Sequence, residues 1–310
     1  MGARSPGGPI VFLTRAVAGA LPSRYMQIMR VTVAKTAGFC WGVRRTVEKT
    51  FETMENVAGP IVTLGPVIHN PQVINRLKSQ GVEVKDVVAD IDDGVTVVVR
   101  THGALKSEMA AAKERGLVVV DGTCPYVKVP QVMVQRMSRD GYHILIIGDE
   151  AHAEIKGVAS YAEGPVTVLA PGAPVPDLPG VKKVGMVCQT TIQSEFFKQA
   201  VSEAVLKFKE VRAYNTICHD TDERQTETRA VAAGVDAVVV VGGHNSANTR
   251  HLAEISHALQ PNTHHVETAD ELDPRWFSGC QVVGVSAGAS TPDWVIDEVV
   301  KKLEAIGVQL

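Results

Sequence analysis

Short, continuous apolar runs alternate with amphipathic stretches along the chain from about residue 29 to the C-terminus. Apolar runs such as IVTL, ILII and VVVV are typical of strands that are covered on both faces of a parallel sheet. The amphipathic stretches between them are typical of helices. The pattern therefore predicts an α/β fold with mostly parallel sheets.

The alternation forms one unit that occurs three times along the chain. Each unit has a strand that ends at a cysteine, a helix, a buried strand that ends in a histidine-bearing turn, a second helix, a strand that ends in small residues, and a last helix. The helices are expected at 41–54, 71–81, 105–116, 125–141, 155–164, 192–210, 219–234, 249–259 and 292–307. We therefore expect three pseudo-repeated small α/β domains that cover 29–124, 125–214 and 215–310.

The first 28 residues lie outside this repeat. They contain arginines but no acidic residue, a composition that is compatible with a targeting segment. An upstream start codon fits better, with Met26 or Met29 as the functional start, because Arg15 interrupts the apolar stretch. We expect residues 1–28 to be a disordered or mis-started extension.

Composition narrows the class of protein. The 310 residues are 45% apolar, which is enough for two or three compact cores. The net charge of −3 argues against nucleic acid as the main partner, and no apolar run approaches the ~20 residues that span a membrane. Five widely spread cysteines do not form the pattern of a disulfide framework, and they favour a reducing, cytoplasmic location.

Three of the cysteines, Cys40, Cys124 and Cys218, occupy the same position in the three units. Because parallel sheets place ligands at the carboxyl ends of their strands, quasi-threefold repetition would bring the three thiols to one central point. Three thiolates can hold a four-iron cluster with one iron left open, or a zinc ion with one open position, and the pattern alone leaves both alternatives open. Cys188 and Cys280 have no counterparts in the other units, and we interpret them as packing residues.

Histidines and small residues follow the other strands. His69, His102 and His152 lie in strand-end turns, as do the stretches HNSAN (244–248) and AGAS (287–290). Small residues let backbone N–H groups approach an anion, helix N-termini favour negative charge, and imidazoles donate hydrogen bonds to phosphate. These features predict a pocket for a small anion such as a diphosphate. The chain has no Walker lysine and no G-x-G-x-x-G motif, so a nucleotide is not indicated.

Glu154 follows His152 by two residues in the same turn. Beside a cluster and a histidine it is a candidate general acid, because partial burial would raise its pKa towards neutrality. Thr190, at the end of another strand, is a candidate to relay a proton or to hold a substrate hydroxyl. Its alternative role is to cap the helix that follows.

These residues lie in segments that together resemble one known family. The segments are AGFCWGVRRTVE, TLGPVIHNPQVINRL, RTHG, GTCPYVKVPQ, AHAEIKG, QTT, NTIC with the nearby RQ, NSANTRHLAEI and SAGASTPDW. They follow in this order from about residue 29 to the C-terminus, and the chain thereby resembles the LytB/IspH family of 4-hydroxy-3-methylbut-2-enyl diphosphate reductases. The resemblance implies a trefoil-like arrangement of the three domains around one central iron–sulfur cluster.

The resemblance also implies a reaction and its residues. The reaction is the two-electron reductive dehydroxylation of 4-hydroxy-3-methylbut-2-enyl diphosphate to isopentenyl and dimethylallyl diphosphate, the last step of the non-mevalonate isoprenoid pathway. It would take place at the open iron of one [4Fe-4S] cluster per chain, with ferredoxin or flavodoxin as the electron donor. The implied cluster ligands are Cys40, Cys124 and Cys218, and the implied diphosphate contacts are His69, His102, His152, Ser246, Asn248 and Ser290. Glu154 is implied as the proton donor, with Thr190 as its partner and His152 beside it.

Three positions depart from the family pattern. Ala153 replaces the proline of the usual His-Pro-Glu, which we expect to loosen the turn that aims Glu154. The pair His219-Asp220 brings charge near the cluster, and Ala247 removes one possible phosphate hydroxyl.

Two alternatives to the reductase are weighed against it. One is a related iron–sulfur enzyme of the same fold that acts on another substrate, as a hydro-lyase or a desulfurising enzyme; a hydro-lyase would need no external electron donor. The other is a non-enzymatic cluster protein, a sensor or electron carrier, which would have no need of a general acid or of converging histidines.

Overall fold

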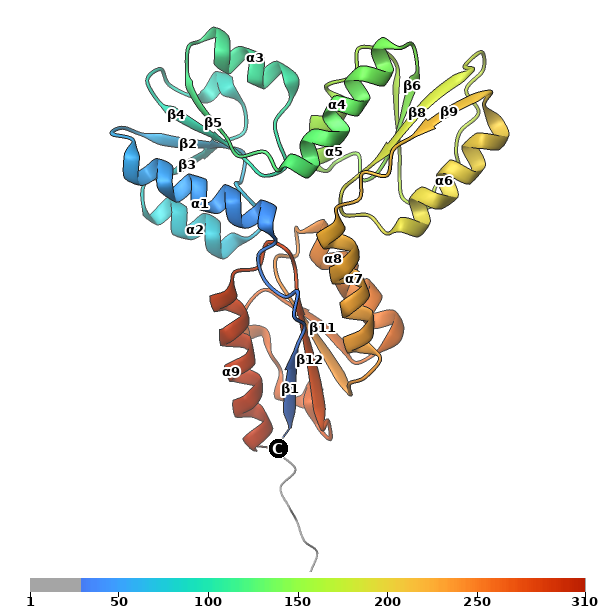
Figure 1. Cartoon of the computed structure of the whole chain (residues 1–310). Coiled ribbons are helices and arrows are strands. Elements are labelled where there is room, and N and C mark those ends of the chain that lie inside the picture. Colours follow the sequence, from blue (N-terminus) through green and yellow to red (C-terminus); the bar gives the residue numbers. More distant parts are fainter. Residues whose placement is uncertain (1–28, 310) are drawn as a thin grey trace, which may run out of the picture.

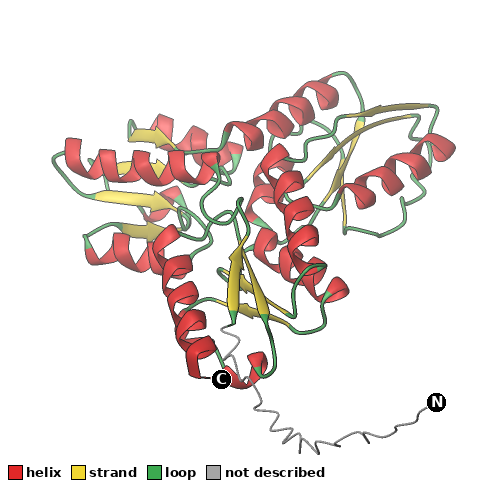
Figure 2. Ribbon diagram, turned by 60° about the horizontal axis from the view of Figure 1, so that its bottom comes forward, coloured by secondary structure: helices red, strands yellow, loops and turns green. Residues whose placement is uncertain are grey.

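The computed structural model describes residues 29–309, which form three four-stranded sheets flanked by helices (Figures 1 and 2). The first sheet has the order β3-β2-β4-β5, the second β7-β6-β8-β9 and the third β1-β12-β10-β11. Every pair of neighbouring strands is parallel. The prediction of an α/β fold with parallel sheets is therefore confirmed. The expectation for residues 1–28 falls outside the described residues.

The strands are short. Their bounds are β1 Arg30–Val33, β2 Ile61–Leu64, β3 Glu83–Lys85, β4 Thr96–Val99, β5 Val118–Asp121, β6 His143–Ile147, β7 Val166–Leu169, β8 Lys183–Cys188, β9 Glu210–Ala213, β10 Ala237–Val241, β11 Thr263–Val266 and β12 Val282–Ala287. The two middle strands of each sheet are almost wholly buried, as continuous apolar runs require.

The helices begin at residues that satisfy their first backbone N–H groups. The side chains of Asn70 and Ser246 accept hydrogen bonds from the third residue of the helix that each precedes, and Pro71 and Pro125 stand at first helical positions. The bounds are α1 Trp41–Asn56, α2 Pro71–Ser79, α3 Lys106–Glu114, α4 Pro125–Arg139, α5 Ala153–Ala159, α6 Ser194–Lys207, α7 His219–Ala232, α8 Ala247–Leu259 and α9 Asp293–Gln309, with short 3-10 helices at Val88–Asp90, Ala269–Glu271 and Pro274–Phe277.

Each sheet has an apolar cluster on each of its two faces. In the first sheet Val97 and Val99 belong to one cluster and Val98 to another, because successive side chains of a strand point to opposite faces. The second and third sheets repeat this alternation, with Leu145 against Ile146 and Val239 against Val240. Every sheet therefore has a core on both faces, and the polar strand ends are left for the centre of the molecule.

Figure 1 shows three lobes that meet at one centre, each built around one sheet. The chain passes from one sheet to the next through β1 and α1, through β5 and α4, and through β9 and α7. Each of these crossings carries one of the three matched cysteines, directly before the helix. The quasi-threefold repetition expected from the sequence therefore places the three crossings side by side at the centre.

Two features of the sheets differ from the expectations. The strand before Cys40 was assigned to the unit 29–124, but β1 pairs with β12 of the third sheet. It is the edge strand from which the chain leaves that sheet, as β5 and β9 are in theirs, whereas the division into domains as such stays a prediction. The fourth strand of each sheet, β3, β7 or β11, was not foreseen, because these segments are three or four residues long and mostly half-exposed.

Candidate active site

The three matched cysteines hold equivalent positions in the backbone. Each is the N-cap residue of a helix: Cys40 of α1, Cys124 of α4 and Cys218 of α7. Their backbone N–H groups donate to the carbonyls of Ala289, Thr101 and Thr190, at distances of 3.1, 2.9 and 2.9 Å. These carbonyls follow the middle strands β12, β4 and β8, so one hydrogen bond fixes each cysteine to the end of its own sheet.

The side chains of the three cysteines line the same cavity. Three helix N-termini point towards it, and their dipoles favour negative charge there. A Cβ on Gly42 would lie 2.5 Å from the Cys124 Sγ, so the first turn of α1 approaches that sulfur as closely as only glycine permits. Burial raises the pKa of all three thiols. Three converging sulfur donors fit a soft metal group that binds thiolates, and its binding would release their protons.

The other two cysteines lie elsewhere. Cys188 is buried in β8, where its Sγ lies 3.5 Å from the Thr216 hydroxyl, and burial raises its pKa to about 11. Cys280 packs against the core of the third sheet, near the Asn262 amide. Both positions are those of packing residues.

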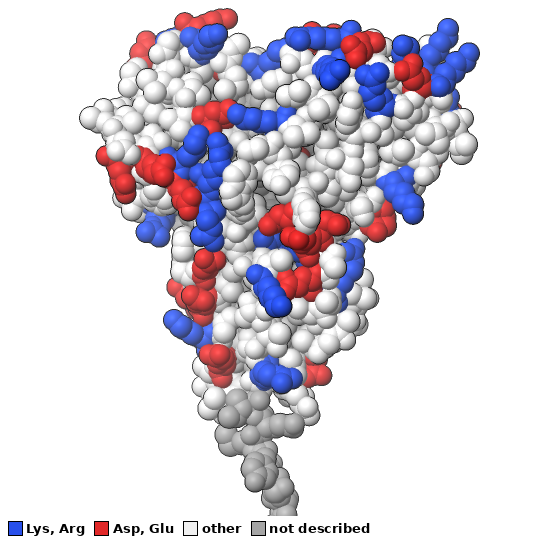
Figure 3. All heavy atoms as spheres, viewed as in Figure 1, with Lys and Arg blue, Asp and Glu red and all other residues white. Residues whose placement is uncertain are grey.

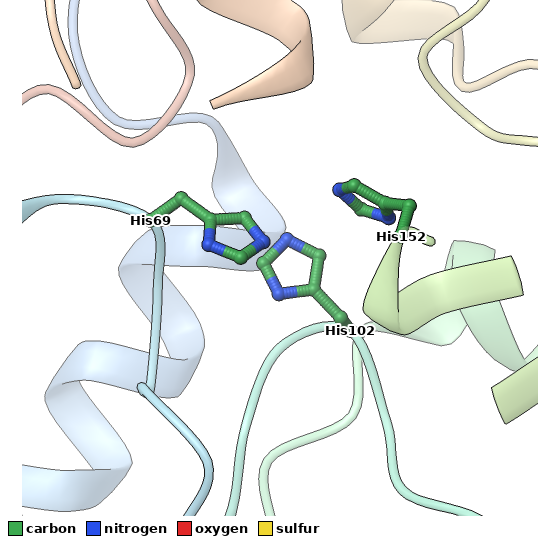
Figure 4. Close-up of side chains that lie close together, drawn as sticks. All are labelled: His69, His102 and His152. Carbon is green, nitrogen blue, oxygen red and sulfur yellow. The ribbon is translucent and has the colours of Figure 1, made fainter. Parts of the chain in front are cut away.

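His69, His102 and His152 form a compact group beside the cysteines (Figure 4). The ring centroids of His69 and His102 lie 4.3 Å apart, and each lies 5.3 Å from that of His152. One ring nitrogen of each lies within 4.8 Å of the other two. The residues follow β2 and β4 and cap α5, so they come from the first and second sheets and meet across the junction of two lobes.

The electrostatics of this group favour an anion. Burial is the main cause of a lowered pKa in all three histidines. The pKa of His69 and that of His152 fall to about 4, and the pKa of His102 falls well below its ordinary value. The positive charge of Arg100 lowers all three further. Three neutral imidazoles at this spacing also match the geometry of a metal site. The nearby guanidinium of Arg100, and that of Arg250 beside His69 and His152, oppose a cation and attract an anion.

Several buried polar atoms at this cavity find no hydrogen-bond partner among residues 29–309. They are the His69 Nε2, the His102 Nδ1, the Thr101 hydroxyl and both polar atoms of the Asn248 amide. Buried polar groups are nearly always paired in folded proteins. A group of orphaned atoms on one cavity wall therefore indicates a polar ligand.

The third sheet contributes the remaining predicted contacts. Ser246 caps α8, Asn248 lies in its first turn, and Ser290 follows β12 and donates to the His69 carbonyl over 3.2 Å. All three line the cavity together with the histidines. Because α8 begins at Ala247, two residues earlier than expected, its N-terminus faces the cavity, which favours an anion. Ala247 is itself buried at the first helical position.

Glu154 is 1% exposed, and its two carboxylate oxygens accept from Thr190, one from the backbone N–H (2.7 Å) and one from the hydroxyl (2.8 Å). Burial raises its pKa to about 7, although the hydrogen bonds from Thr190 act in the opposite direction. The carboxyl group is therefore poised to give up a proton near neutral pH. The His152 Nδ1 accepts from the Glu154 backbone N–H (3.2 Å), which leaves the His152 Nε2 as a donor.

Ala153 was expected to loosen the turn that positions Glu154, but the structure holds the Glu154 carboxyl group by other contacts. Ala153 is the first residue of α5, a position that either proline or alanine can occupy. Glu154 is held by Thr190, which comes from the next strand of the same sheet, rather than by the turn before it.

Sequence reasoning missed the role of Arg224. Its side chain is 2% exposed and donates to the Ala287 carbonyl (3.0 Å), to the Thr36 carbonyl and to the Asp220 carboxylate (3.2 and 3.4 Å). One turn further along α7, Glu227 accepts from two backbone N–H groups of the loop that leads to Cys40, at 2.7 Å each. Asp220, in the first turn of α7, is thus the carboxylate partner of Arg224. The only sequence signal for this link was the RQ pair within the resemblance.

Thr101, Thr191 and Thr221 also line the cavity and were not predicted as site residues. Its apolar walls include Val43 and Val127, from the first turns of α1 and α4. The cavity thus joins thiols, a short apolar stretch, an acidic group and an anion pocket.

A three-lobed α/β fold with three thiols at its centre and an anion pocket beside them defines a class of metal-dependent enzyme, and comparison with known proteins gives the family. Residues 31–304 match the family model described as LytB protein, and the chain belongs to this family. The LytB family is an iron–sulfur enzyme family.

Relatives of known name agree with this assignment. A protein from Anaeromyxobacter sp. (strain Fw109-5) is 61% identical over 87% of this chain and 95% of its own length, and one from Geobacter sulfurreducens is 50% identical over 89% and 97%. Both are named 4-hydroxy-3-methylbut-2-enyl diphosphate reductase.

Solved structures are similar as well. One, described as the terminal enzyme of the non-mevalonate pathway, is 42% identical, has a TM-score of 0.67 and covers 89% of this chain and 99% of its own. The diphosphate reductase from Plasmodium falciparum is 26% identical, with a TM-score of 0.82 over 88% and 87%. Within residues 29–309, no helix is long and apolar enough to cross a membrane.

Proposed function

We propose that this protein reduces 4-hydroxy-3-methylbut-2-enyl diphosphate to isopentenyl and dimethylallyl diphosphate, with loss of the allylic hydroxyl as water. One observation carries the proposal: three thiols, a buried carboxyl group of raised pKa and an anion pocket with orphaned polar atoms line a single cavity. The relatives that cover most of the chain are named for this reaction, which supports the choice of substrate.

Cys40, Cys124 and Cys218 would hold one [4Fe-4S] cluster, with no fourth protein ligand. The support is the equivalence of their three backbone positions and the close approach that Gly42 allows. When bound, such a cluster supplies one-electron redox chemistry and a Lewis-acidic iron that carries no protein ligand. Zinc, which the sequence left open, is the less suitable alternative, because the LytB family is an iron–sulfur family.

The anion pocket would bind the diphosphate. The first and second lobes contribute His69, His102 and His152 to the lining of this cavity, and the third lobe contributes Ser246, Asn248 and Ser290. A dianion raises the pKa of adjacent imidazoles, so each histidine can gain a proton and donate a charge-assisted hydrogen bond. Holding the diphosphate there directs the other end of a short allylic chain past Val43 and Val127 towards the thiols.

Glu154 would supply the proton that the departing hydroxyl needs. A hydroxide is a poor leaving group, and protonation as the C–O bond breaks turns it into water. Protonated Glu154 can donate to the Thr190 oxygen, whose own hydroxyl proton is then free to pass to the substrate oxygen. The cavity wall formed by Thr190 and Glu154 lies beside the cysteines, which puts this relay at the hydroxyl end of the substrate.

The reaction consumes two electrons, for which a ferredoxin or flavodoxin is the proposed donor. The test is anaerobic turnover of the allylic diphosphate with reduced methyl viologen, with products separated by chromatography. Formation of both isoprenoid diphosphates in proportion to viologen oxidised would support the reductase. Conversion without any reductant would favour a hydro-lyase, and no conversion at full cluster content would favour a non-enzymatic cluster protein.

A further inference from the structure

The second and third lobes are joined by few polar contacts. The chain passes between them after β9, and the Cys218 backbone N–H donates to the Thr190 carbonyl (2.9 Å). Beyond these links, within residues 29–309, one side-chain hydrogen bond joins a helix of the third lobe to the second lobe: the His251 Nδ1 lies 3.0 Å from the Thr191 carbonyl oxygen. His251 lies on α8, and Thr191 follows β8. This bond therefore ties a helix of one lobe to a strand end of the other.

Within the described part of the chain, ion pairs add no second link at this junction. Figure 3 shows acidic side chains gathered over the start of α7, where the lobes meet. At that helix start Asp220 pairs with Arg224 (3.2 Å) and Glu223 lies 3.5 Å from the His219 ring, so these contacts stay within α7. Further along, a cleft of about 270 Å³ lies between Gln193 of the second lobe and helices α7 and α8 of the third. The hydrogen bond of His251 is therefore not duplicated by a charged contact.

The contact fixes the tautomer of His251. A backbone carbonyl oxygen only accepts hydrogen bonds, so the His251 Nδ1 carries a proton and donates it to Thr191. The ring is half-buried, which shields the bond in part from competing water. His251 therefore has a defined donor atom, and a substitution can remove that donor without removing the bulk of the side chain.

The helix that carries His251 also carries part of the anion pocket. Ser246 caps α8, and Asn248 lies in its first turn, where both polar atoms of its amide are orphaned at the cavity. His251 follows Asn248 by three residues, so the two side chains lie one turn apart on the same face of the helix. The side of α8 that lines the cavity is therefore continuous with the side that contacts the second lobe.

At the other end of the hydrogen bond lies the turn that carries the proposed proton relay. Thr191 directly follows Thr190, whose backbone N–H and hydroxyl donate to the Glu154 carboxylate at 2.7 and 2.8 Å. Thr191 itself lines the cavity, and its hydroxyl accepts from the Gln189 amide (3.2 Å). Since His251 holds the backbone next to Thr190, loss of its hydrogen bond would let the relay shift, and a misplacement of ~1 Å can cost ~10²-fold in rate.

We propose that His251 is a positioning residue, whose hydrogen bond to the Thr191 carbonyl sets the place of the Thr190–Glu154 relay relative to the anion pocket at the start of α8. The proposal rests on the proposed function, in which the two ends of one short substrate meet the pocket and the relay at the same time. His251 does not line the cavity and acts through Thr191. Its removal therefore affects proton delivery more than it affects the binding of the diphosphate.

The test uses two substitutions of His251 in the holoenzyme, each of which keeps a different property. His251→Phe keeps a ring and removes the donor, whereas His251→Asn loses the ring and keeps an N–H donor near the position of Nδ1. His257→Phe is the matched control, because His257 is an exposed histidine in the last turn of the same helix. Three quantities are measured: turnover with reduced methyl viologen, the Kd of pyrophosphate, and hydrogen exchange of the segment 189–193 with and without pyrophosphate.

His251→Phe should lower kcat by about tenfold at unchanged iron content and with little change in KM, because the relay is displaced while the anion pocket is kept. In the wild type, pyrophosphate should slow the exchange of 189–193 by about threefold, because it holds α8 and, through His251, the Thr191 backbone. This slowing should be absent in His251→Phe, and linkage limits the accompanying change in the pyrophosphate Kd to the same factor. His251→Asn and His257→Phe should keep the wild-type kcat and the wild-type slowing.

The positioning role is overturned if His251→Phe keeps the wild-type kcat, if pyrophosphate affects exchange equally in this variant and in the wild type, or if His251→Asn does not restore both properties. An equal loss in His257→Phe would also overturn it, because any change on α8 would then suffice. Failure of the proposed function has a different signature. It would appear as absence of turnover with methyl viologen in the wild type, whereas the exchange and the pyrophosphate Kd are read without any turnover.

Discussion

Replacing Glu154 by glutamine tests the central claim about the site. The change keeps the shape of the side chain and its capacity to pair with Thr190, but it removes the acid. Burial raises the Glu154 pKa to about 7, so about half of the carboxyl groups carry the proton at neutral pH. If that proton is the one delivered to the leaving hydroxyl, Glu154→Gln should lower kcat by ~10²-fold or more, the usual scale for a positioned general acid.

The pH profile gives the sign of the effect. Above about pH 7 the acid form of Glu154 is lost, so kcat of the wild type should fall as the pH rises from 7 to 9, approaching tenfold per unit. The residual kcat of Glu154→Gln should be flat over the same range. Glu298→Gln, an exposed carboxylate on α9, should keep both the wild-type kcat and the wild-type profile.

A stability measurement supplies an independent magnitude. The folded-state pKa of about 7 lies above the ordinary value of 4.5. Ionised Glu154 therefore destabilises the folded protein, by about 3 kcal/mol at ~1.4 kcal/mol per pH unit. This cost is absent below pH 4.5, grows between 4.5 and 7, and is complete above 7. Since glutamine does not ionise, the Tm of Glu154→Gln relative to the wild type should rise by several degrees between pH 5 and pH 8.

The reasoning would be refuted by two results. Near-normal turnover of Glu154→Gln at full iron content would show that the proton comes from another group. A Tm difference between variant and wild type that does not change with pH would show that Glu154 ionises at its ordinary pKa.

The other parts of the site give three further predictions. Anaerobically prepared protein should contain about four irons per chain. Replacing any one of the three central cysteines by serine should abolish the cluster, whereas Cys188→Ser should retain it. Stoichiometric zinc without iron would contradict the assignment. His102→Ala should weaken pyrophosphate binding by about ten- to a hundredfold. Because burial holds the pKa of this imidazole low, calorimetry of the wild type in two buffers should show proton uptake at pH 7, and zero uptake would argue against imidazolium–phosphate pairing. Arg224→Met should lower the Tm by several degrees and reduce iron retention, because it leaves Asp220 without its buried partner; an unchanged Tm would contradict the link between α7 and the Cys40 loop.

The parts of the fold that could be predicted are those whose signal is local. Continuous valine runs such as 97–99 and 238–241 mark the buried middle strands, and Asn70 and Ser246 mark helix starts. The edge strand β3, with the sequence EVK, has no such signal, because one half-buried face over three residues gives almost no periodicity. The pairing of β1 with β12 is a contact between the two ends of the chain, which no local pattern encodes.

The residues of the site also fall into those with a signal in the sequence and those that only tertiary packing reveals. The matched positions of Cys40, Cys124 and Cys218 follow from the repeat, and the structure brings the three side chains to one cavity. Arg224 could not be found in this way, because α7 reads as a polar helix and only tertiary packing buries one of its charged residues.

The pairing of β1 with β12 determines when, during synthesis, the third sheet and the cysteine site can form. During synthesis β1 leaves the ribosome before the other described strands, whereas its neighbour β12 is the last of these strands to be made. The loop that carries Cys40 is held by Arg224, Glu227 and the Ala289 carbonyl, all of which also emerge late. A nascent chain therefore cannot assemble all three thiols, and we expect a chain truncated before β12 to retain little iron. We therefore expect the three-thiol site to form only after β12 has been made.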